Sequence, residues 1–316
     1  MLCCSNGIFQ SSIMELDCKQ YTFNDSRCPI LPPDSQQCPQ RGEDFRKVFT
    51  DADEARDAYK IGMKMTGTKH RKYLKGARYR NVLFDKAIVL DVRDYGGLLN
   101  LNVRVDDHTI STFKVRDLNH EIEALDFIKK FSETSNKDSE ARSSAGDFGS
   151  MFAFGKHNRV NGDYISMKDT SMDIRNYCLV SRKLLDKYFR EDVRKIIDAD
   201  RKQGITASKS MGGNDGISAY CLISRDLINA AHYDLDTTVS ITIFHEKING
   251  RAKDWFFVLP NTVVNGKNSN KAVVIKLFDG CTLCWDGRKI YHCTGTRDIG
   301  EGNHLYGNFW GGKTYR

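Results

Sequence analysis

Three side chains in the second half of the chain have the types and the spacing of a metal-binding set. His232 and Asp234 lie two residues apart in the run AHYDLD, residues 231–236, and His292 lies further along the chain. Side chains at positions i and i+2 of a strand point to the same face, so His232 and Asp234 are expected to face one interior space. Two imidazoles and one carboxylate suit Fe(II) and leave coordination positions open. The sequence therefore predicts an iron site at His232, Asp234 and His292.

The elements that must position these ligands have the pattern of β-strands. From Ile217 onward short apolar runs alternate with turn signals, which is typical of an all-β barrel or jelly roll. Asp286-Gly287 is a strong hairpin-turn signal, and it places His292 on the strand that returns from the turn. The expected strands are residues 239–246, 273–277, 281–285, 289–292 and 304–310.

This order of features resembles the 2-oxoglutarate-dependent iron(II) dioxygenase superfamily. Its double-stranded β-helix core, a jelly-roll or cupin-like fold, carries an HxD motif early and a distal His on the penultimate strand. Here the HxD motif at residues 232–234 opens a β-rich half, and a single strand-like run follows His292. The resemblance covers residues 150–316. It implies an oxidoreductase that hydroxylates an unactivated C–H bond with dioxygen, Fe(II) and 2-oxoglutarate or a related co-substrate.

The residues that would hold the co-substrate depart from the superfamily pattern. The superfamily usually binds the distal carboxylate of 2-oxoglutarate with an Arg or Lys on the last core strand. In this chain the first inward-pointing candidate on that strand is His304. Arg297, in the loop after His292, is the cation expected to bind the co-substrate, and an ion pair with Asp298 or Glu301 is an equal alternative. The departure leaves ascorbate open as the co-substrate.

Two further residues are expected to complete the site. Asp236 lies two residues beyond Asp234, so on a continuous strand it also faces inward and could orient a ligand or act on the substrate as the catalytic carboxylate. Tyr220 is expected to contact the co-substrate. In a DNA enzyme, Tyr220, Trp255, Phe256 and Trp310 could line the pocket for the flipped base, and the alternative is that these aromatic residues form barrel core.

One group within the superfamily, the TET-like enzymes, oxidises the methyl group of 5-methylcytosine in DNA, and its algal branch uses ascorbate. The resemblance to this group rests on motif order and on the run TKHRKYLKGARYR, residues 68–80. Lys and Arg in this run could neutralise phosphates, and Tyr73 and Tyr79 offer stacking faces. A DNA enzyme would flip the target base into its pocket. The alternative for residues 68–80 is a solvated, partly helical surface segment.

Other assignments of the same residues were considered. Cys281-x-x-Cys284 with Cys293 could bind zinc, but residues three apart on a strand face opposite sides, and no second CxxC exists. Two competing functions remain open. One is a small-molecule hydroxylase of the same superfamily, and the other is a jelly-roll binding module without catalytic activity.

Composition indicates a globular protein. The 316 residues are 40% hydrophobic and 28% charged, with a net charge of +7 that permits an anionic partner without requiring one. No stretch approaches the roughly 20 apolar residues of a membrane span, and the first 20 residues lack the pattern of a signal peptide. We therefore expect an intracellular protein, cytoplasmic or nuclear, with no membrane partner.

The expected fold class is α+β in two parts. Residues 1–45 read as a flexible Cys/Pro-rich tail, and residues 46–131 read as a small N-terminal α/β region with helices expected at 43–64 and 118–131. A polar linker at residues 132–146 separates this region from a double-stranded β-helix domain at residues 147–316. A helix at residues 181–201 is expected to back the sheet of that domain.

Overall fold

The structure is a computed structural model of the chain. It describes residues 12–17, 48–49, 82–83, 88–104, 110–135, 148–155, 172–205, 207, 211–228, 234, 236–247, 255–264, 267–290, 292–296 and 304–313.

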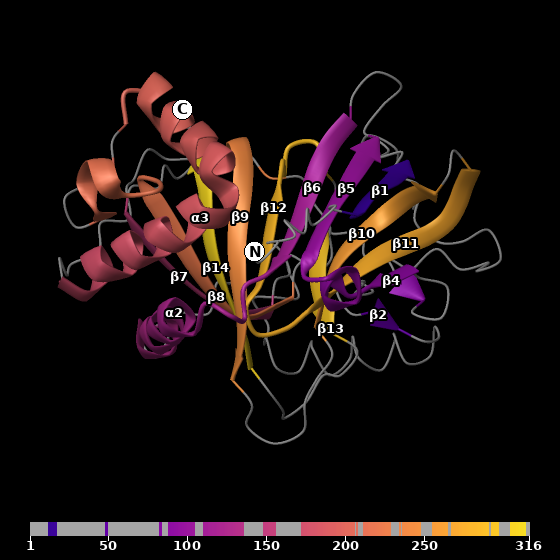
Figure 1. Ribbon diagram of the computed structural model, residues 1–316, viewed down its shortest axis with the longest axis horizontal. Coiled ribbons are helices and arrows are strands. Elements are labelled where there is room, and N and C mark those ends of the chain that lie inside the picture. The colour runs from indigo at the N-terminus through magenta and orange to yellow at the C-terminus, as the bar shows by residue number, and fades with distance from the viewer. Residues whose placement is uncertain are drawn as a thin grey trace, which may run out of the picture.

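The described residues form a β-rich molecule with two α-helices (Figure 1). The helices are α2 (Ile122–Ser135) and α3 (Met172–Lys202), and the short 3-10 helices are η2 (Val92–Tyr95) and η5 (Gly213–Asp215). The first strands are β1 (Ser12–Asp17), β2 (Val48–Phe49), β3 (Val82–Leu83), β4 (Ile88–Leu90), β5 (Leu98–Arg104), β6 (Ile110–Asp117) and β7 (Phe148–Gly155). The later strands are β8 (Tyr220–Ile228), β9 (Asp236–Lys247), β10 (Trp255–Val264), β11 (Lys267–Leu277), β12 (Cys281–Trp285), β13 (Cys293–Thr296) and β14 (His304–Lys313).

Twelve of these strands form one strongly curved sheet. The hydrogen-bonded order is β4-β11-β10-β1-β5-β6-β12-β9-β14-β8-β7, and β13 pairs with β10. The last strand, β14, lies between β8 and β9, whereas β13 joins β10 and β11 on the opposite wall. The chain therefore crosses between two walls along β8 to β14, which makes the fold jelly-roll-like and confirms the all-β pattern predicted from Ile217 onward.

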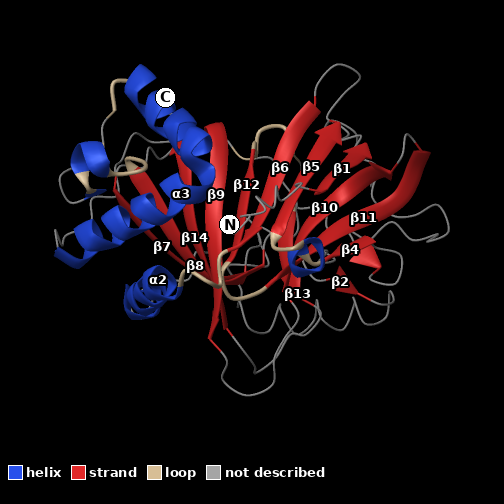
Figure 2. Ribbon diagram, viewed as in Figure 1, coloured by secondary structure: helices blue, strands red, loops and turns tan. Residues whose placement is uncertain are grey.

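Two hydrophobic cores lie on the two faces of the sheet. The interior core is enclosed by the curved sheet and takes side chains from both walls, including Phe113, Phe257, Leu283 and Trp285. The second core lies between the sheet and the two helices, which cover only one face of β7, β8, β14 and β9 (Figure 2). Successive side chains of a strand point to opposite faces of the sheet, and so to opposite cores. The core to which a side chain belongs therefore shows which face of the sheet it is on.

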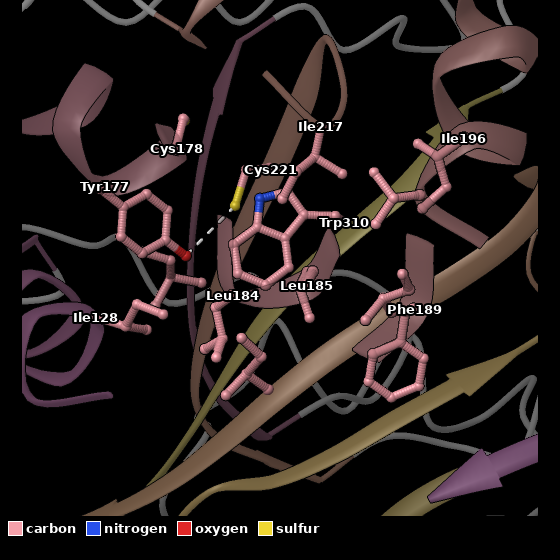
Figure 3. Close-up of a cluster of buried hydrophobic side chains, with 14 of the residues drawn as sticks. Ile128, Tyr177, Cys178, Leu184, Leu185, Phe189, Ile196, Ile217, Cys221 and Trp310 are labelled. Carbon is pink, nitrogen blue, oxygen red and sulfur yellow. Dashed lines mark hydrogen bonds between the residues drawn. The ribbon is translucent and has the colours of Figure 1, made fainter. Parts of the chain in front are cut away.

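The helix-covered core contains a buried polar network as well as the packed side chains of Figure 3. The Asn308 side-chain oxygen accepts hydrogen bonds from Ser132 Oγ (2.6 Å) and Tyr177 Oη (2.7 Å). The Asn308 amide nitrogen lies 3.2 Å from His245 Nδ1. Because α2, α3 and two strands contribute these groups, the network fixes how both helices dock on the sheet.

Several elements differ in extent from those that the sequence predicts. The helix expected at 181–201 lies inside α3, which begins at Met172 and has a non-helical residue at Phe189. Val48 and Phe49 form β2 instead of the expected helix at 43–64, whose other residues lie outside the described part of the chain. The strand expected at 289–292 is largely the turn that follows Trp285, and β13 begins at Cys293.

Strands from both sides of the predicted domain boundary belong to one sheet. Lys114–Asp117 of β6 pair with Cys281–Cys284 of β12. Helix α2 ends at Ser135, inside the linker expected at 132–146, and residues 136–147 lie outside the described part. The division of the chain into two domains stays a prediction.

The described cysteines, Cys178, Cys221, Cys281, Cys284 and Cys293, are free and buried. Cys281 belongs to the interior core and Cys284 to the helix-covered core, so these two thiols point to opposite faces. Among the helices that the structure describes, none is long and apolar enough to cross a membrane.

Candidate metal centre

His292 lies at the end of the turn between β12 and β13, where the chain crosses from one wall to the other. The side chain is buried, with 3% of its surface exposed. Its ring stacks on Phe257 of β10 at 5.1 Å with an interplanar angle of 11°. The ring of Trp285 lies edge-on to it at 5.2 Å. Both walls thus hold the imidazole plane in one orientation inside the jelly roll.

A backbone hydrogen bond fixes the tautomer of this imidazole. His292 Nδ1 lies 2.8 Å from the carbonyl oxygen of Ile290. A carbonyl oxygen can only accept a hydrogen bond, so Nδ1 carries the proton and, in the neutral ring, Nε2 presents its lone pair. Metal-binding histidines are commonly held in this way. His292 is therefore prepared to act as a ligand through Nε2.

Asp234 is the group that His292 Nε2 faces. Asp234 Oδ2 lies 3.5 Å from His292 Nε2. Both atoms are lone-pair donors when the imidazole is neutral, and at this separation one cation can contact both. The two residues are far apart in the sequence, and the turn after β12 brings them together. The residues present at this position therefore fit a divalent metal of the Fe(II) type.

The same turn also positions the carboxylate. The Asp234 backbone N–H donates to the Gly287 carbonyl oxygen at 2.9 Å. A Cβ atom added at Gly287 would lie 2.1 Å from Asp234 Oδ2, so no other residue type leaves room for the carboxylate. The sequence marks Asp286-Gly287 only as a hairpin turn, and the close approach of Asp234 is a second reason for glycine there.

The third expected ligand, His232, lies outside the described residues. The sequence predicted that His232 and Asp234 lie on one strand that continues directly into residues 239–246. In the structure β9 begins at Asp236, and Asp234 precedes it without being part of the strand. The common orientation of His232 and Asp234 thus stays a prediction, whereas the approach of Asp234 to His292 follows from the turn.

Asp236, the expected catalytic carboxylate, is buried at the start of β9. Its Oδ2 accepts a hydrogen bond from Ser240 Oγ at 2.5 Å. The charge of Asp236 contributes to the environment of a second buried carboxyl, Asp200, whose pKa is raised to about 6, first by burial and to a smaller extent by Asp236. One carboxylate oxygen of Asp236 is thus bound by Ser240 within β9. A catalytic role for Asp236 stays a prediction.

Two of the residues expected to hold the co-substrate, Tyr220 and His304, are described, and they lie on opposite faces of the sheet. Tyr220 alternates along β8 with Cys221 of the helix-covered core, so it faces the interior. His304 lies two residues before Tyr306 of the helix-covered core, so both side chains are on the helix-covered face of β14. There, His304 Nδ1 is 2.6 Å from Asp226 Oδ2. The structure thus does not place His304 beside His292. Arg297 lies outside the described residues.

The described aromatic residues differ in part from the four that were expected to line the pocket. Trp310 belongs to the helix-covered core, where it stacks on Tyr177 at 5.8 Å. Phe257 and Trp285, which were not in the expected set, contact the ring of His292. Strand alternation could have shown that Phe257, rather than Phe256, shares a face with Trp255, but only the pairing of β13 with β10 brings Phe257 to His292.

No protein-family model and no curated protein sequence matches the chain. Among solved structures, NgTET1 in complex with 5mC DNA overlaps 80% of this chain and 90% of its own, with a TM-score of 0.47 and 13% identity. OsALKBH1 overlaps 64% of this chain and 96% of its own, with a TM-score of 0.30 and 12% identity.

A third solved structure, JOX2 in complex with 2OG, Fe and JA, overlaps 72% of this chain and 75% of its own. Its TM-score is 0.31 and its identity 8%. Similarity at this level carries no conclusion about activity. The functional assignment of the chain therefore rests on its own geometry.

Proposed function

We propose that the chain is a non-haem Fe(II)-dependent dioxygenase with a double-stranded β-helix core and a metal site at His232, Asp234 and His292. The observation that carries this proposal is the position of His292 Nε2, 3.5 Å from Asp234 Oδ2, with Nδ1 bound to the Ile290 carbonyl oxygen. The jelly-roll-like strand order adds support, because such a core could carry a metal site of this kind in its interior. In this proposal 2-oxoglutarate or a related co-substrate such as ascorbate completes the reaction.

The chain's own groups perform three tasks in this proposal. His292 offers one neutral nitrogen ligand, held by Ile290 and by the stacked ring of Phe257. Asp234 offers a carboxylate whose place is kept by Gly287. Phe257 and Trp285 exclude water from the surroundings of the site. When bound, Fe(II) supplies the binding and reductive activation of dioxygen that hydroxylation of a C–H bond requires.

The test is anaerobic loading of the full chain with Fe(II), followed by oxygen-uptake measurements with 2-oxoglutarate and ascorbate in parallel. We expect one metal ion per chain and oxygen uptake that depends on one of the two co-substrates. A chain that binds no iron would contradict the proposal and favour the alternative of a jelly-roll binding module. Iron binding without co-substrate-dependent uptake would contradict the dioxygenase assignment.

The substrate class forms a narrower part of the proposal. We infer that the substrate is a base in DNA, such as 5-methylcytosine, on the basis of the basic and aromatic run at residues 68–80. This run lies outside the described residues, so the inference depends on the sequence alone. The alternative is a small-molecule hydroxylase in which residues 68–80 are a solvated surface segment.

Replacing Lys69, Arg71, Lys72 and Lys75 by alanine separates these substrate classes. If the segment contacts phosphates, we expect DNA affinity to fall and the slope of log affinity against log salt to decrease by about 0.7–0.9 for each lost contact. Fluorescence anisotropy with a labelled oligonucleotide at several salt concentrations measures both quantities. An unchanged affinity and slope would contradict a DNA-binding role for this segment.

A further inference from the structure

A cavity of about 320 Å³ lies where the turn between η2 and β5, the C-terminal end of β6 and helix α3 come together. Its lining includes Arg93, Gly97, Arg116, Asp117, His120 and Tyr188. Gly96 also borders it, and a Cβ atom added there would meet nothing within 4 Å. Cavities of this size hold small organic molecules.

Arg116 is the buried cation of this cavity, with 9% of its side chain exposed. It follows Val115 of the interior core, so it points to the opposite face of β6. There its guanidinium lies over the ring of Phe189 in α3, with 5.6 Å between Cζ and the ring centroid. His292 stacks on Phe257 of the interior core. The sheet therefore separates Arg116 from the candidate metal centre.

The hydrogen bonds of Arg116 within the described part of the chain all go to neutral acceptors. Nη1 donates to the carbonyl oxygens of Leu99 at 3.1 Å and Val115 at 2.7 Å. Nη2 donates to Asn100 Oδ1 at 2.8 Å. These bonds use three of the five N–H groups of the guanidinium, and Nε donates to none of the described residues. Arg116 thus keeps donors for a further acceptor.

Asp192, the carboxylate whose charge acts on Arg116, is bound to other cations. Its Oδ2 accepts a hydrogen bond from Lys114 Nζ at 2.5 Å, and its Oδ1 accepts one from Lys195 Nζ at 3.0 Å. Burial lowers the pKa of Arg116, and the charge of Asp192 offsets this only in part. Arg116 has no ion pair among the described residues. Burying such a charge destabilises the fold, and an anion in the adjoining cavity would neutralise it.

The other charged residues of the cavity limit the charge of its ligand. Arg93 is bound through Nε and Nη2 to Asp91, so its charge is neutralised within the protein. Arg116 is therefore the cation available to a ligand. Asp117 lines the same cavity and would repel a second negative charge. This combination favours a singly charged anion over a phosphate dianion.

We propose that this cavity binds a small organic carboxylate, and that the carboxylate group pairs with the Arg116 guanidinium. The planar set of N–H groups of arginine matches the two oxygen atoms of a carboxylate. The site lies outside the jelly-roll interior and does not depend on the proposed Fe(II) site.

The test is saturation-transfer NMR titration of the full chain at constant ionic strength. The probes are acetate, butyrate, benzoate and methyl phosphate, at a pH where methyl phosphate is a dianion. We expect at least one of the carboxylates to bind, and methyl phosphate to bind more weakly than acetate. If no carboxylate binds, or if only methyl phosphate binds, the proposal is wrong.

Arg116→Met removes the charge and keeps a long side chain. We expect it to weaken carboxylate binding at least about tenfold. The matched control is Arg182→Met. Arg182 is also partly buried and donates to the Gly216 carbonyl oxygen at 2.8 Å, but it pairs with Asp186 and does not line the cavity. Its replacement should leave the affinity unchanged. Equal affinities in Arg116→Met and wild type would overturn the proposal.

Asp117→Asn tests the same site by an effect that a folding defect cannot imitate. Asparagine keeps the Oδ1 acceptor for the Asn119 backbone N–H, which lies 2.9 Å away, but removes the negative charge from the cavity wall. We expect carboxylates and methyl phosphate to bind more tightly to this variant. Unchanged or weaker binding of both would contradict the proposed position of the anion.

His292→Ala distinguishes this cavity from the candidate metal centre. Because the two lie on opposite faces of the sheet, we expect the variant to bind the carboxylate as wild type does. If binding is lost in His292→Ala and kept in Arg116→Met, the carboxylate occupies the metal centre. That result would overturn the present inference and leave the proposed function standing. Failure of iron loading would have the reverse meaning.

Discussion

Replacing His292 by alanine should abolish specific metal binding, with a loss of affinity of more than about 100-fold, and with it all co-substrate-dependent oxygen uptake. Asp234→Ala should have the same effect. Each variant removes one of the two atoms that lie 3.5 Å apart and leaves only two of the three proposed ligands. Calorimetry with Mn(II) under anaerobic conditions measures the affinity, and circular dichroism shows whether the variants are folded.

Two control variants separate a ligand role from a general effect on the fold. His120→Ala removes an exposed histidine whose Nε2 contacts the Tyr188 hydroxyl, and it should leave metal affinity unchanged. Gly287→Ala keeps every ligand but places a Cβ atom 2.1 Å from Asp234 Oδ2, so we expect a loss of about 10- to 100-fold. Wild-type affinity in His292→Ala would refute the metal site. Equal losses in His120→Ala would show that the effect is not specific.

The second large effect is a pH-dependent contribution of His245 to stability. Burial, and to a smaller extent the charge of Lys129, lowers the pKa of His245 from 6.5 to about 3. Below pH 6.5 the unfolded chain therefore binds a proton that the folded chain does not. The free energy of unfolding falls as the pH drops, by up to about 1.4 kcal/mol per pH unit between about 6.5 and 3. Above pH 6.5 the contribution of His245 is constant.

Asp200 acts in the opposite direction over part of this range. Burial raises the pKa of Asp200 from 3.8 to about 6, so the folded chain takes up this proton first as the pH falls. Asp200 therefore adds stability as the pH drops from about 6 to 3.8. The two groups nearly cancel there, and we expect the wild-type profile to be shallow between pH 4 and 6.

His245→Gln and Asp200→Asn should separate these contributions. As the pH falls from 7 to 4, the free energy of unfolding of His245→Gln should rise by about 3 kcal/mol relative to that of wild type. The reason is that glutamine does not bind the proton that the unfolded wild-type chain takes up on His245. Asp200→Asn should show the reverse, a steeper loss towards low pH. Urea unfolding at half-unit pH steps measures both curves. Parallel curves for wild type and His245→Gln would contradict the neutral, buried state of His245.

The sequence by itself determined the local elements and the chemical types of the site. Short apolar runs separated by turn signals from Ile217 onward predicted the β-rich half, and the 3.6-residue period predicted the helix at 181–201 within α3. The same rule predicted that Cys281 and Cys284 face opposite sides, as they do. These features depend on neighbours a few residues apart, and the sequence records such neighbours directly.

The tertiary structure decided which residues meet. Asp234 lies outside the strand that was expected to carry it. It reaches His292 because its backbone N–H binds the Gly287 carbonyl oxygen, in the turn that leads to His292. His304 was expected to point inward and lies on the helix-covered face, because β14 pairs with β9 in the register that puts Leu305 inside. Alternation fixes the two faces of a strand, but it does not say which face becomes the interior.

The physical reason is that the two faces of a strand in this protein have similar sequences. Which face lies in the interior is determined by long-range strand pairing and by the curvature of the sheet. Both faces of β9, β12 and β14 are apolar, since one meets the opposite wall and the other meets α2 and α3. A sequence with two buried faces gives no polar side by which to orient a strand. The sequence does not distinguish the interior face, on which Thr242, Trp285 and His292 lie, from the helix-covered face, on which His245 lies. The closure of the sheet and the docking of the helices determine this difference.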